Sequence, residues 1–113
     1  MKIYNKTKKT TISDKAKQCI SLFSKARGLM FSKQNDLIFV ENNERNIPLH
    51  MWFVFYQIDV LYLNKDKKVI EIKENFLPFT FYFPKNKAKY IIELKKGAVS
   101  ASKTAIMDHL QFD

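Results

Sequence analysis

The feature that most limits what this chain can fold into is an apolar run near its middle, Pro48–Leu63. The run is rich in aromatic and β-branched residues, which favour strands, and two side chains that resist burial, His50 and Asp59, stand within it. A carboxylate buried alone costs several kcal/mol, so Asp59 must be paired, protonated or exposed at a strand end. The run therefore predicts buried strands in which Asp59 is either a structural anchor or part of a site.

The composition is that of one packed domain. A chain of 113 residues with 46% hydrophobic residues can bury a core without a metal or a disulfide. Its single cysteine, Cys19, excludes an intramolecular disulfide, and its two histidines have no zinc-ligand spacing. Residues 1–14 are polar and basic, unlike a signal peptide. We expect a cytoplasmic domain over residues 1–113, without cofactor, metal or membrane contact.

The pattern of apolar residues predicts a mostly β domain of the α+β class. Residues 2–5 and 9–12 form a basic N-terminal hairpin, and a helix then begins at Ser13 or Asp14 and ends near Gly28. The strand-like runs are Leu37–Val40, Leu49–Phe55, Ile58–Asn64, Val69–Lys73, Tyr90–Leu94 and His109–Phe112. Residues 76–83 suit a loop or an edge segment because they contain Pro78, and residues 98–103 suit one helical turn. Together these elements indicate a curled sheet or a partial β-barrel.

Three segments occur in a familiar order: Ala26–Phe31, then Ile58–Leu63 after a His-Met-aromatic strand, then Tyr90–Leu94 followed by Gly97. In this order the chain resembles the domain of unknown function 192 family, small proteins of bacteria and archaea. The resemblance runs from about residue 16 to the C-terminus. Gln57 stands where that family usually has Pro, and Met107 where it usually has Gly, so two turns should differ. The resemblance implies a compact, largely β domain and no established activity.

Five residues are candidates for ligand binding: Arg27, His50, Trp52, Asp59 and Glu93. In the functional interpretation, Asp59 is an acid, base or hydrogen-bond acceptor in a pocket near His50. In the structural interpretation, which we favour, Asp59 accepts hydrogen bonds from the backbone or from Arg27 and fixes a corner. Arg27 can equally pair with Glu93, but we expect the Glu93 side chain to be exposed to solvent.

The net charge of +9 raises the question of nucleic acid. Residues 1–27 hold eight basic side chains and one acidic one, a net charge of +7, which we interpret as a solvated lysine-rich surface in preference to a phosphate-binding one. Lys85, Lys87 and Lys89 follow or alternate with aromatic residues of the segment 79–90, as in a platform for single strands. Alternation along a strand would instead bury half of these rings in the core.

The sequence identifies no reaction, and we assign no catalytic residue. We expect a non-enzymatic binding or accessory module, monomeric or weakly dimeric, that takes a small-molecule or protein ligand on an aromatic-lined face. One alternative is an uncharacterised enzyme with Asp59 as general base. The other is a weak nucleic-acid binder that uses its basic segments.

Overall fold

The computed structural model describes residues 1–19, 35–51 and 55–112, which form three β-sheets and a short helix. The central sheet has the strand order β3-β4-β9-β6-β7, with bounds Lys17–Cys19, Leu37–Arg45, Ala88–Lys95, Ile58–Leu63 and Val69–Phe76. A three-stranded sheet has the order β10-β1-β2, with bounds Leu110–Gln111, Ile3–Asn5 and Thr10–Ser13. The third sheet pairs β5 (Leu49–His50) with β8 (Phe81–Tyr82), and the helix α2 spans Ala98–Ser102.

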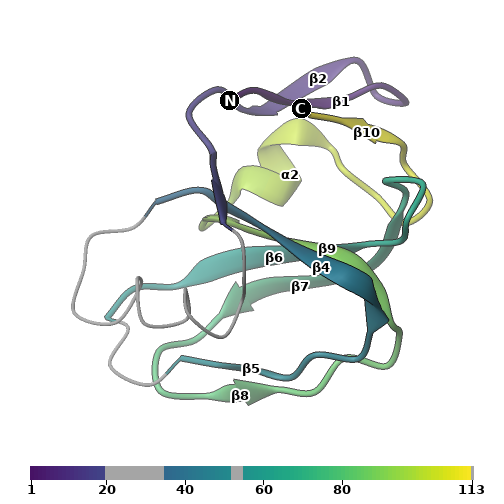
Figure 1. Cartoon of the computed structure of the whole chain (residues 1–113). Helices are drawn as coiled ribbons and strands as arrows, with labels where there is room; N and C mark the ends of the chain where they lie inside the picture. The colour runs from purple at the N-terminus through teal and green to yellow at the C-terminus, as the bar shows by residue number, and fades with distance from the viewer. Residues whose placement is uncertain (20–34, 52–54, 113) are drawn as a thin grey trace.

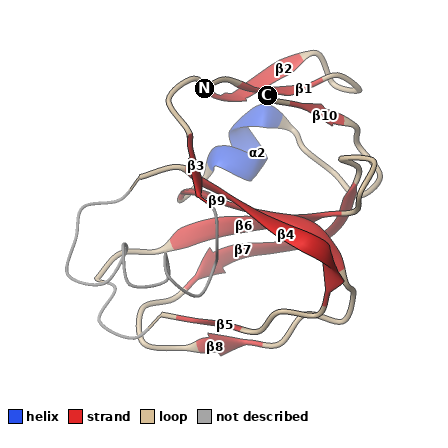
Figure 2. Ribbon diagram, viewed as in Figure 1, coloured by secondary structure: helices blue, strands red, loops and turns tan. Residues whose placement is uncertain are grey.

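The central sheet separates two layers of the molecule. The helix α2 and the three-stranded sheet lie against one face, which we call the α2 face, and β5 and β8 lie against the other, the β8 face (Figures 1 and 2). All six residues of β6 are buried, because both faces are covered and the strand is paired on both sides with β7 and β9. The sequence prediction of a mostly β domain is confirmed.

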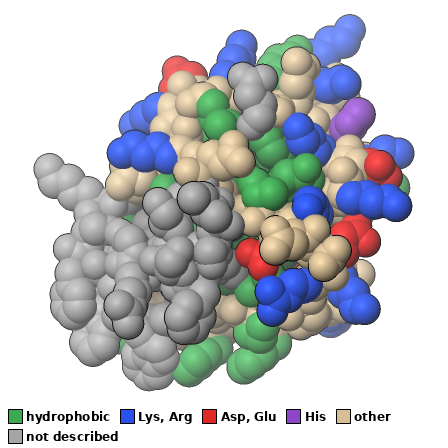
Figure 3. All heavy atoms as spheres, viewed as in Figure 1, with side chains coloured by type: hydrophobic (Ala, Val, Ile, Leu, Met, Phe, Trp, Pro, Cys, Tyr) green, Lys and Arg blue, Asp and Glu red, His purple; other side chains and the backbone are tan. Residues whose placement is uncertain are grey.

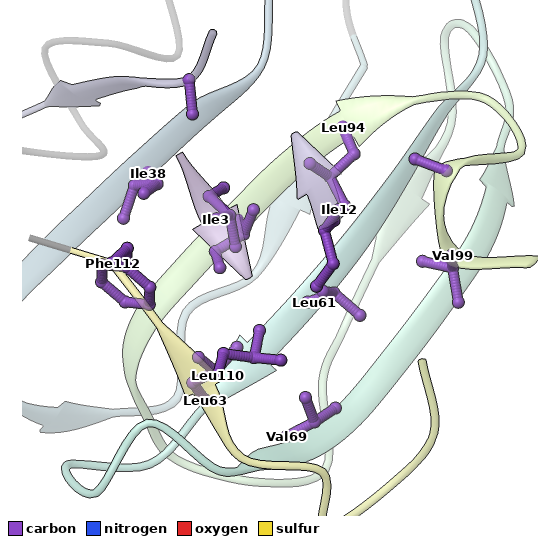
Figure 4. Packing of buried hydrophobic residues seen from close by; sticks show 13 residues of the cluster. Ile3, Ile12, Ile38, Leu61, Leu63, Val69, Leu94, Val99, Leu110 and Phe112 are labelled. Atoms are coloured by element: carbon purple, nitrogen blue, oxygen red, sulfur yellow. The ribbon is translucent and has the colours of Figure 1, made fainter. Parts of the chain in front are cut away.

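Side chains alternate between the two layers along each central strand, as the two-residue period of a strand requires. On the α2 face, Leu61 and Leu63 of β6 pack with Ile3, Val99 and Leu110 (Figure 4). On the β8 face, a second cluster contains Leu37, Phe39, Leu49, Met51, Ile58, Val60, Tyr62, Phe76, Ala88 and Ile91. The fold therefore has two hydrophobic cores that share one sheet.

Most predicted elements are present. The N-terminal hairpin, the polar turn at residues 64–68, the strand near residue 90, the helical turn after Gly97 and the last short strand all form. In the turn, the Asn64 Oδ1 accepts hydrogen bonds from the amides of Asp66 and Lys68, which closes the β6–β7 hairpin. The segment 76–83, predicted as a loop or an edge, ends β7 at Phe76 and supplies the short strand β8.

The start of the predicted helix is wrong. Ser13 ends β2 and its hydroxyl donates to Asp36 at 2.6 Å instead of capping a helix, and residues 17–19 form β3, which pairs in parallel with β4. The rest of that prediction, residues 20–34, lies outside the described residues. Of the predicted strand Leu49–Phe55, only Leu49–His50 is a strand in the part that the structure describes.

The central sheet is not a barrel. Its edges, β3 and β7, do not pair with each other among the described strands, and β5 and β8 pair only with each other. Of the two predicted forms, a curled sheet or a partial β-barrel, the barrel is therefore wrong, because the strands of the two outer layers form sheets separate from the open central sheet. No helix in the described part of the chain is long and apolar enough to span a bilayer.

Candidate functional site

Four ionisable side chains form a row on the β8 face. Glu93 comes from β9, Tyr62 from β6, Glu71 from β7 and Tyr82 from β8. Tyr62 is the cross-strand partner of Glu71, and Glu93 lies opposite Val60, two residues from Tyr62 on the same face. The surrounding side chains are those of the apolar cluster on this face, so the row is a polar line through an aromatic and aliphatic layer.

At one end of the row, Glu71 is fully hydrogen-bonded. Its carboxylate accepts from the Tyr82 hydroxyl, from the backbone amides of Lys85 and Asn86, and from the Asn86 side chain. Burial alone would raise the pKa of Glu71, but these bonds outweigh it and lower the pKa. For Tyr82, burial together with the Glu71 carboxylate raises the pKa to about 12. This end of the row is a structural anchor that attaches β8 to β7.

At the other end, Glu93 is buried without such support. Its side chain is 5% exposed, and its Oε1 has no hydrogen-bond partner among the described residues. Burial raises the pKa of Glu93 to about 8, so the carboxyl is mainly protonated at neutral pH. The expectation that Glu93 is exposed is wrong, because β9 is an inner strand with β4 on one side and β6 on the other.

The Tyr62 hydroxyl is the second polar group of this kind. Tyr62 is fully buried, and its hydroxyl has no hydrogen-bond partner within the described part of the chain. Burial and then the nearby Tyr82, Glu71 and Glu93 raise its pKa far above the usual range. A protonated carboxyl and a phenol can each donate and accept a hydrogen bond, so together they can bind a polar group that the protein itself does not supply.

Asp59, the most conspicuous candidate in the sequence, has a different role. Its side chain is fully buried on the α2 face, where Oδ2 accepts from the amides of Gly97 and Val99, both at 3.1 Å, and Oδ1 accepts from the Asn75 amide at 3.0 Å. These backbone hydrogen bonds agree with the structural interpretation of Asp59. They connect β6 to the start of α2, where Gly97 takes a φ of 88° that suits glycine.

Of the other candidates, the structure describes the side chain of Glu93, and it does not join Asp59 in one pocket. The strand that carries His50, β5, belongs to the β8 face, whereas the Asp59 carboxylate lies on the α2 face. Arg27 and Trp52 fall outside the described residues. Glu93 and Asp59 come from neighbouring strands, Asp59 opposite Leu94, and their side chains lie on opposite faces of the sheet.

An aromatic surface covers the outer side of β8. Phe79, Phe81 and Phe83 are 41%, 52% and 70% exposed, and the nearby Leu77 and Phe55 are also exposed. Hydrophobic side chains are visible at the lower edge of the molecule, at the place of β8 (Figure 3). Lys85 and Lys87 follow in an exposed loop, while the Lys89 ammonium donates to the Asn42 carbonyl.

Sequence reasoning missed Glu71 and the Tyr62 hydroxyl. The available signal was the position of Glu71 between Ile70 and Ile72 in the predicted strand Val69–Lys73. An acidic residue on a buried face of such a strand needs a hydrogen-bond partner. Metal binding finds no support in the described part of the chain, where no group of three His, Cys, Asp or Glu side chains converges.

Comparison with known proteins gives one consistent result. The model of the DUF192 family, described as Uncharacterized ACR, matches residues 3–112. A UPF0127 protein of Thermococcus sibiricus is 32% identical over 115 residues, covering 98% of this chain and 74% of that protein. A UPF0127 protein of Pyrococcus furiosus is 38% identical over 89 residues, covering 76% of each chain.

Two crystal structures share the fold. A Sinorhizobium meliloti protein described as a candidate transcription regulator has a TM-score of 0.83 at 20% identity, over 97% of this chain and 89% of its own. A Novosphingobium aromaticivorans protein of unknown function has a TM-score of 0.82 at 16% identity, over 98% of this chain and 82% of its own. At such identities the likeness establishes the fold alone.

Proposed function

This chain belongs to the DUF192 family of uncharacterised proteins, and we propose that it is a non-enzymatic binding module that holds a small ligand on its β8 face. Glu93 and Tyr62 would be the polar contacts, and the cluster around Phe39 and Phe76 would supply the apolar ones. The observation that carries the proposal is the buried carboxyl of Glu93 with an oxygen that no described residue satisfies.

The energetic argument starts from the rarity of such groups. Leaving a buried donor or acceptor unbonded costs about 1–3 kcal/mol, and a folded domain is stable by only about 5–15 kcal/mol. Two such groups side by side on one face, Glu93 and Tyr62, are therefore a substantial loss of stability. An unsatisfied buried polar group in a folded protein calls for an explanation, and a bound ligand that completes its hydrogen bonds is one such explanation.

The chemistry of the two groups narrows the ligand class. Because the Glu93 carboxyl is mainly protonated at neutral pH, it offers both an O–H donor and a carbonyl acceptor, and so does not require a cation. The apolar residues around it favour a largely apolar molecule with one or two hydrogen-bonding groups, as in most small-molecule sites. An aromatic alcohol or amide fits this description better than a phosphate or a highly charged metabolite.

The alternative of an enzyme with Asp59 as general base has less support. The three hydrogen bonds that described residues make to the Asp59 carboxylate come from backbone amides, and the side chain is fully buried. A general base must reach the proton that it removes within about 2.6–3.2 Å, or through one water molecule. The surroundings of Asp59 therefore favour the structural role.

A thermal-shift screen with purified protein tests the proposal. The panel contains aromatic alcohols, aromatic amides, sugars and nucleosides, and the wild type is compared with Glu93→Met and Tyr62→Phe. We expect at least one alcohol or amide to raise the wild-type Tm, because a ligand that binds only the folded state stabilises it. Both variants should stay folded and lose that shift.

The matched control is Glu74→Gln, which changes an exposed glutamate on β7, the same strand as Glu71. It should keep the full ligand-dependent shift. If no compound in the panel moves the wild-type Tm, or if the shift persists in both Glu93→Met and Tyr62→Phe, the proposal is wrong.

A further inference from the structure

The outer side of β8 presents a second candidate site, separate from the β8 face of the central sheet. Phe81 and Phe83 are stacked, with ring centroids 6.2 Å apart and an interplanar angle of 12°, and both are more than half exposed. Other aromatic residues of the chain, such as Phe39 and Phe76, are fully buried. Exposed aromatic side chains gathered on one element are typical of an interaction surface.

The local structure holds these rings outward. Tyr82 points inward, where its hydroxyl donates to Glu71 and its ring lies 5.9 Å from that of Tyr62. Because side chains alternate along a strand, Phe81 and Phe83 must then face away from the core. The Glu71 carboxylate also accepts the Lys85 amide, so the chain after Phe83 is fixed in place as well. The aromatic surface is therefore preorganised by a buried anchor.

The charge next to the rings is positive. Lys85 and Lys87 are exposed in the loop that follows Phe83, and the Lys73 ammonium lies 5.5 Å from the centroid of the inward Tyr82 ring. The nearest buried carboxylate, Glu71, is already hydrogen-bonded by four groups. Lys85 and Lys87 add two exposed positive charges beside the rings, which favours an anionic partner.

We propose that this surface, Phe79, Phe81 and Phe83 with Lys85 and Lys87, binds single-stranded nucleic acid. Bases stack on the exposed phenylalanine rings while the two lysines contact phosphates, a combination that tolerates many sequences. An apolar peptide would use the rings but gains nothing from the lysines. The proposal does not depend on the function proposed for Glu93, whose side chain lies on the inner layer.

Fluorescence anisotropy with labelled oligo(dT) and oligo(U) of about 12 nucleotides tests the proposal, since aromatic platforms of this kind cover about 4–16 nucleotides. Wild type should bind at low salt, and Phe81→Ala/Phe83→Ala should weaken binding at least about tenfold. Lys85→Gln/Lys87→Gln should lower the slope of log affinity against log salt by about 0.7 for each phosphate that the protein no longer neutralises. The oligo(dT) and oligo(U) arms show whether the surface prefers DNA or RNA.

The matched control is Lys6→Gln/Lys15→Gln, which removes the same charge from two exposed lysines in the N-terminal part of the chain. It should leave affinity within about twofold of the wild type. Loss of binding in this control equal to that in Lys85→Gln/Lys87→Gln would overturn the proposal, because charge alone would then explain binding. The absence of binding at low salt, or self-association that Phe81→Ala/Phe83→Ala abolishes, would also overturn it.

Discussion

Two buried acidic residues on neighbouring strands show how differently one sheet can accommodate a carboxyl. Asp59 has three backbone amides at hydrogen-bond distance, whereas the Glu93 Oε1 has no partner among the described residues. The first arrangement replaces the water that the carboxylate loses on folding, and the second does not. Asp59 therefore stabilises the fold, whereas the burial of the Glu93 carboxyl lowers the stability of the fold.

The role of Asp59 gives the first prediction. Asp59→Asn replaces one acceptor oxygen by an N–H₂ group that faces backbone N–H donors, so we expect the free energy of unfolding to fall by about 1–3 kcal/mol. Urea unfolding measures the loss. Asp66→Asn, an exposed aspartate in the β6–β7 turn, is the control and should change stability by less than about 0.5 kcal/mol. An Asp59→Asn protein as stable as the wild type would refute the structural role.

At the residue scale, the sequence indicated which side chain needs a hydrogen-bond partner, but it did not indicate which side chains are buried. Asp59 could be identified as a residue that needs partners, because it stands in an apolar run. The exposure of Glu93 could not be read in the same way, since alternation gives the face of a strand but not whether that face is covered. The face that carries Glu93 is covered by β5 and β8, two strands that are distant from each other in the sequence.

At the scale of elements, one carboxylate, that of Glu71, attaches β8 and the residues after it to β7. The strand β8 has only two residues and pairs only with the equally short β5 in the described structure, so hydrogen bonds within its sheet can contribute little. Glu71 adds bonds to Tyr82 within β8 and to Lys85 and Asn86 just after it. The aromatic surface on the outer side therefore depends on a polar contact on the inner side.

A pair of identical substitutions tests this attachment. Tyr82→Phe removes a hydroxyl that donates to a charged carboxylate, so we expect a loss of about 1.5 kcal/mol in the free energy of unfolding. Tyr62→Phe removes a hydroxyl without a described partner and should leave stability unchanged or raise it. Equal losses in the two variants would contradict the assignment of these hydroxyls. Urea unfolding of both proteins in the same buffer makes the comparison.

The elements that the sequence misplaced share a cause. Ser13 has the chemistry of a helix cap, but its hydroxyl bonds to Asp36, and the following residues pair with β4. The strands β6, β7 and β9 were predictable because their apolar residues recur over five or more positions. The short strands β3 and β8 were not predicted as strands, because their two or three residues carry too little pattern to outweigh tertiary contacts.

At the scale of the whole molecule, the two ends of the described chain are held together. The strand β1 pairs with both β2 and β10, and the Lys6 amide donates to the His109 carbonyl. Beneath this sheet, Asp108 accepts from the Asn5 side chain at 2.9 Å and from the Lys8 ammonium at 2.8 Å. These contacts join residues about a hundred positions apart, so they support one cooperative domain.

Asp108 therefore gives a prediction with a defined pH dependence. Burial opposes its charge, but its bonds to Lys8, Asn5 and the Ala105 amide prevail and lower its pKa below the ordinary 3.8. A lowered pKa contributes stability above the unfolded value, and this stability is lost as the pH falls through the folded value. Asp108→Asn should lower the free energy of unfolding by about 1–3 kcal/mol at pH 7. The gap from wild type should narrow below pH 3.8 in urea titrations; a constant gap would contradict this account.

The most direct test of the central claim is the pH dependence of stability in wild type and in Glu93→Gln, measured by urea unfolding from pH 5 to pH 8. Burial raises the pKa of Glu93 from 4.5 to about 8, so in this window the folded state holds a proton that the unfolded chain has lost. Wild-type stability should therefore fall as the pH rises, by roughly 1.4 kcal/mol per pH unit from this group.

Glu93→Gln cannot titrate and should lack that component. Glu71 and Asp108 do not confuse the comparison, because their pKa values are lowered below this window and both proteins retain them. A steeper decline in wild type than in Glu93→Gln is the result that a buried carboxyl with a raised pKa predicts. Parallel curves would contradict it, because they would show that Glu93 has an ordinary pKa and a partner or solvent that the fold already supplies.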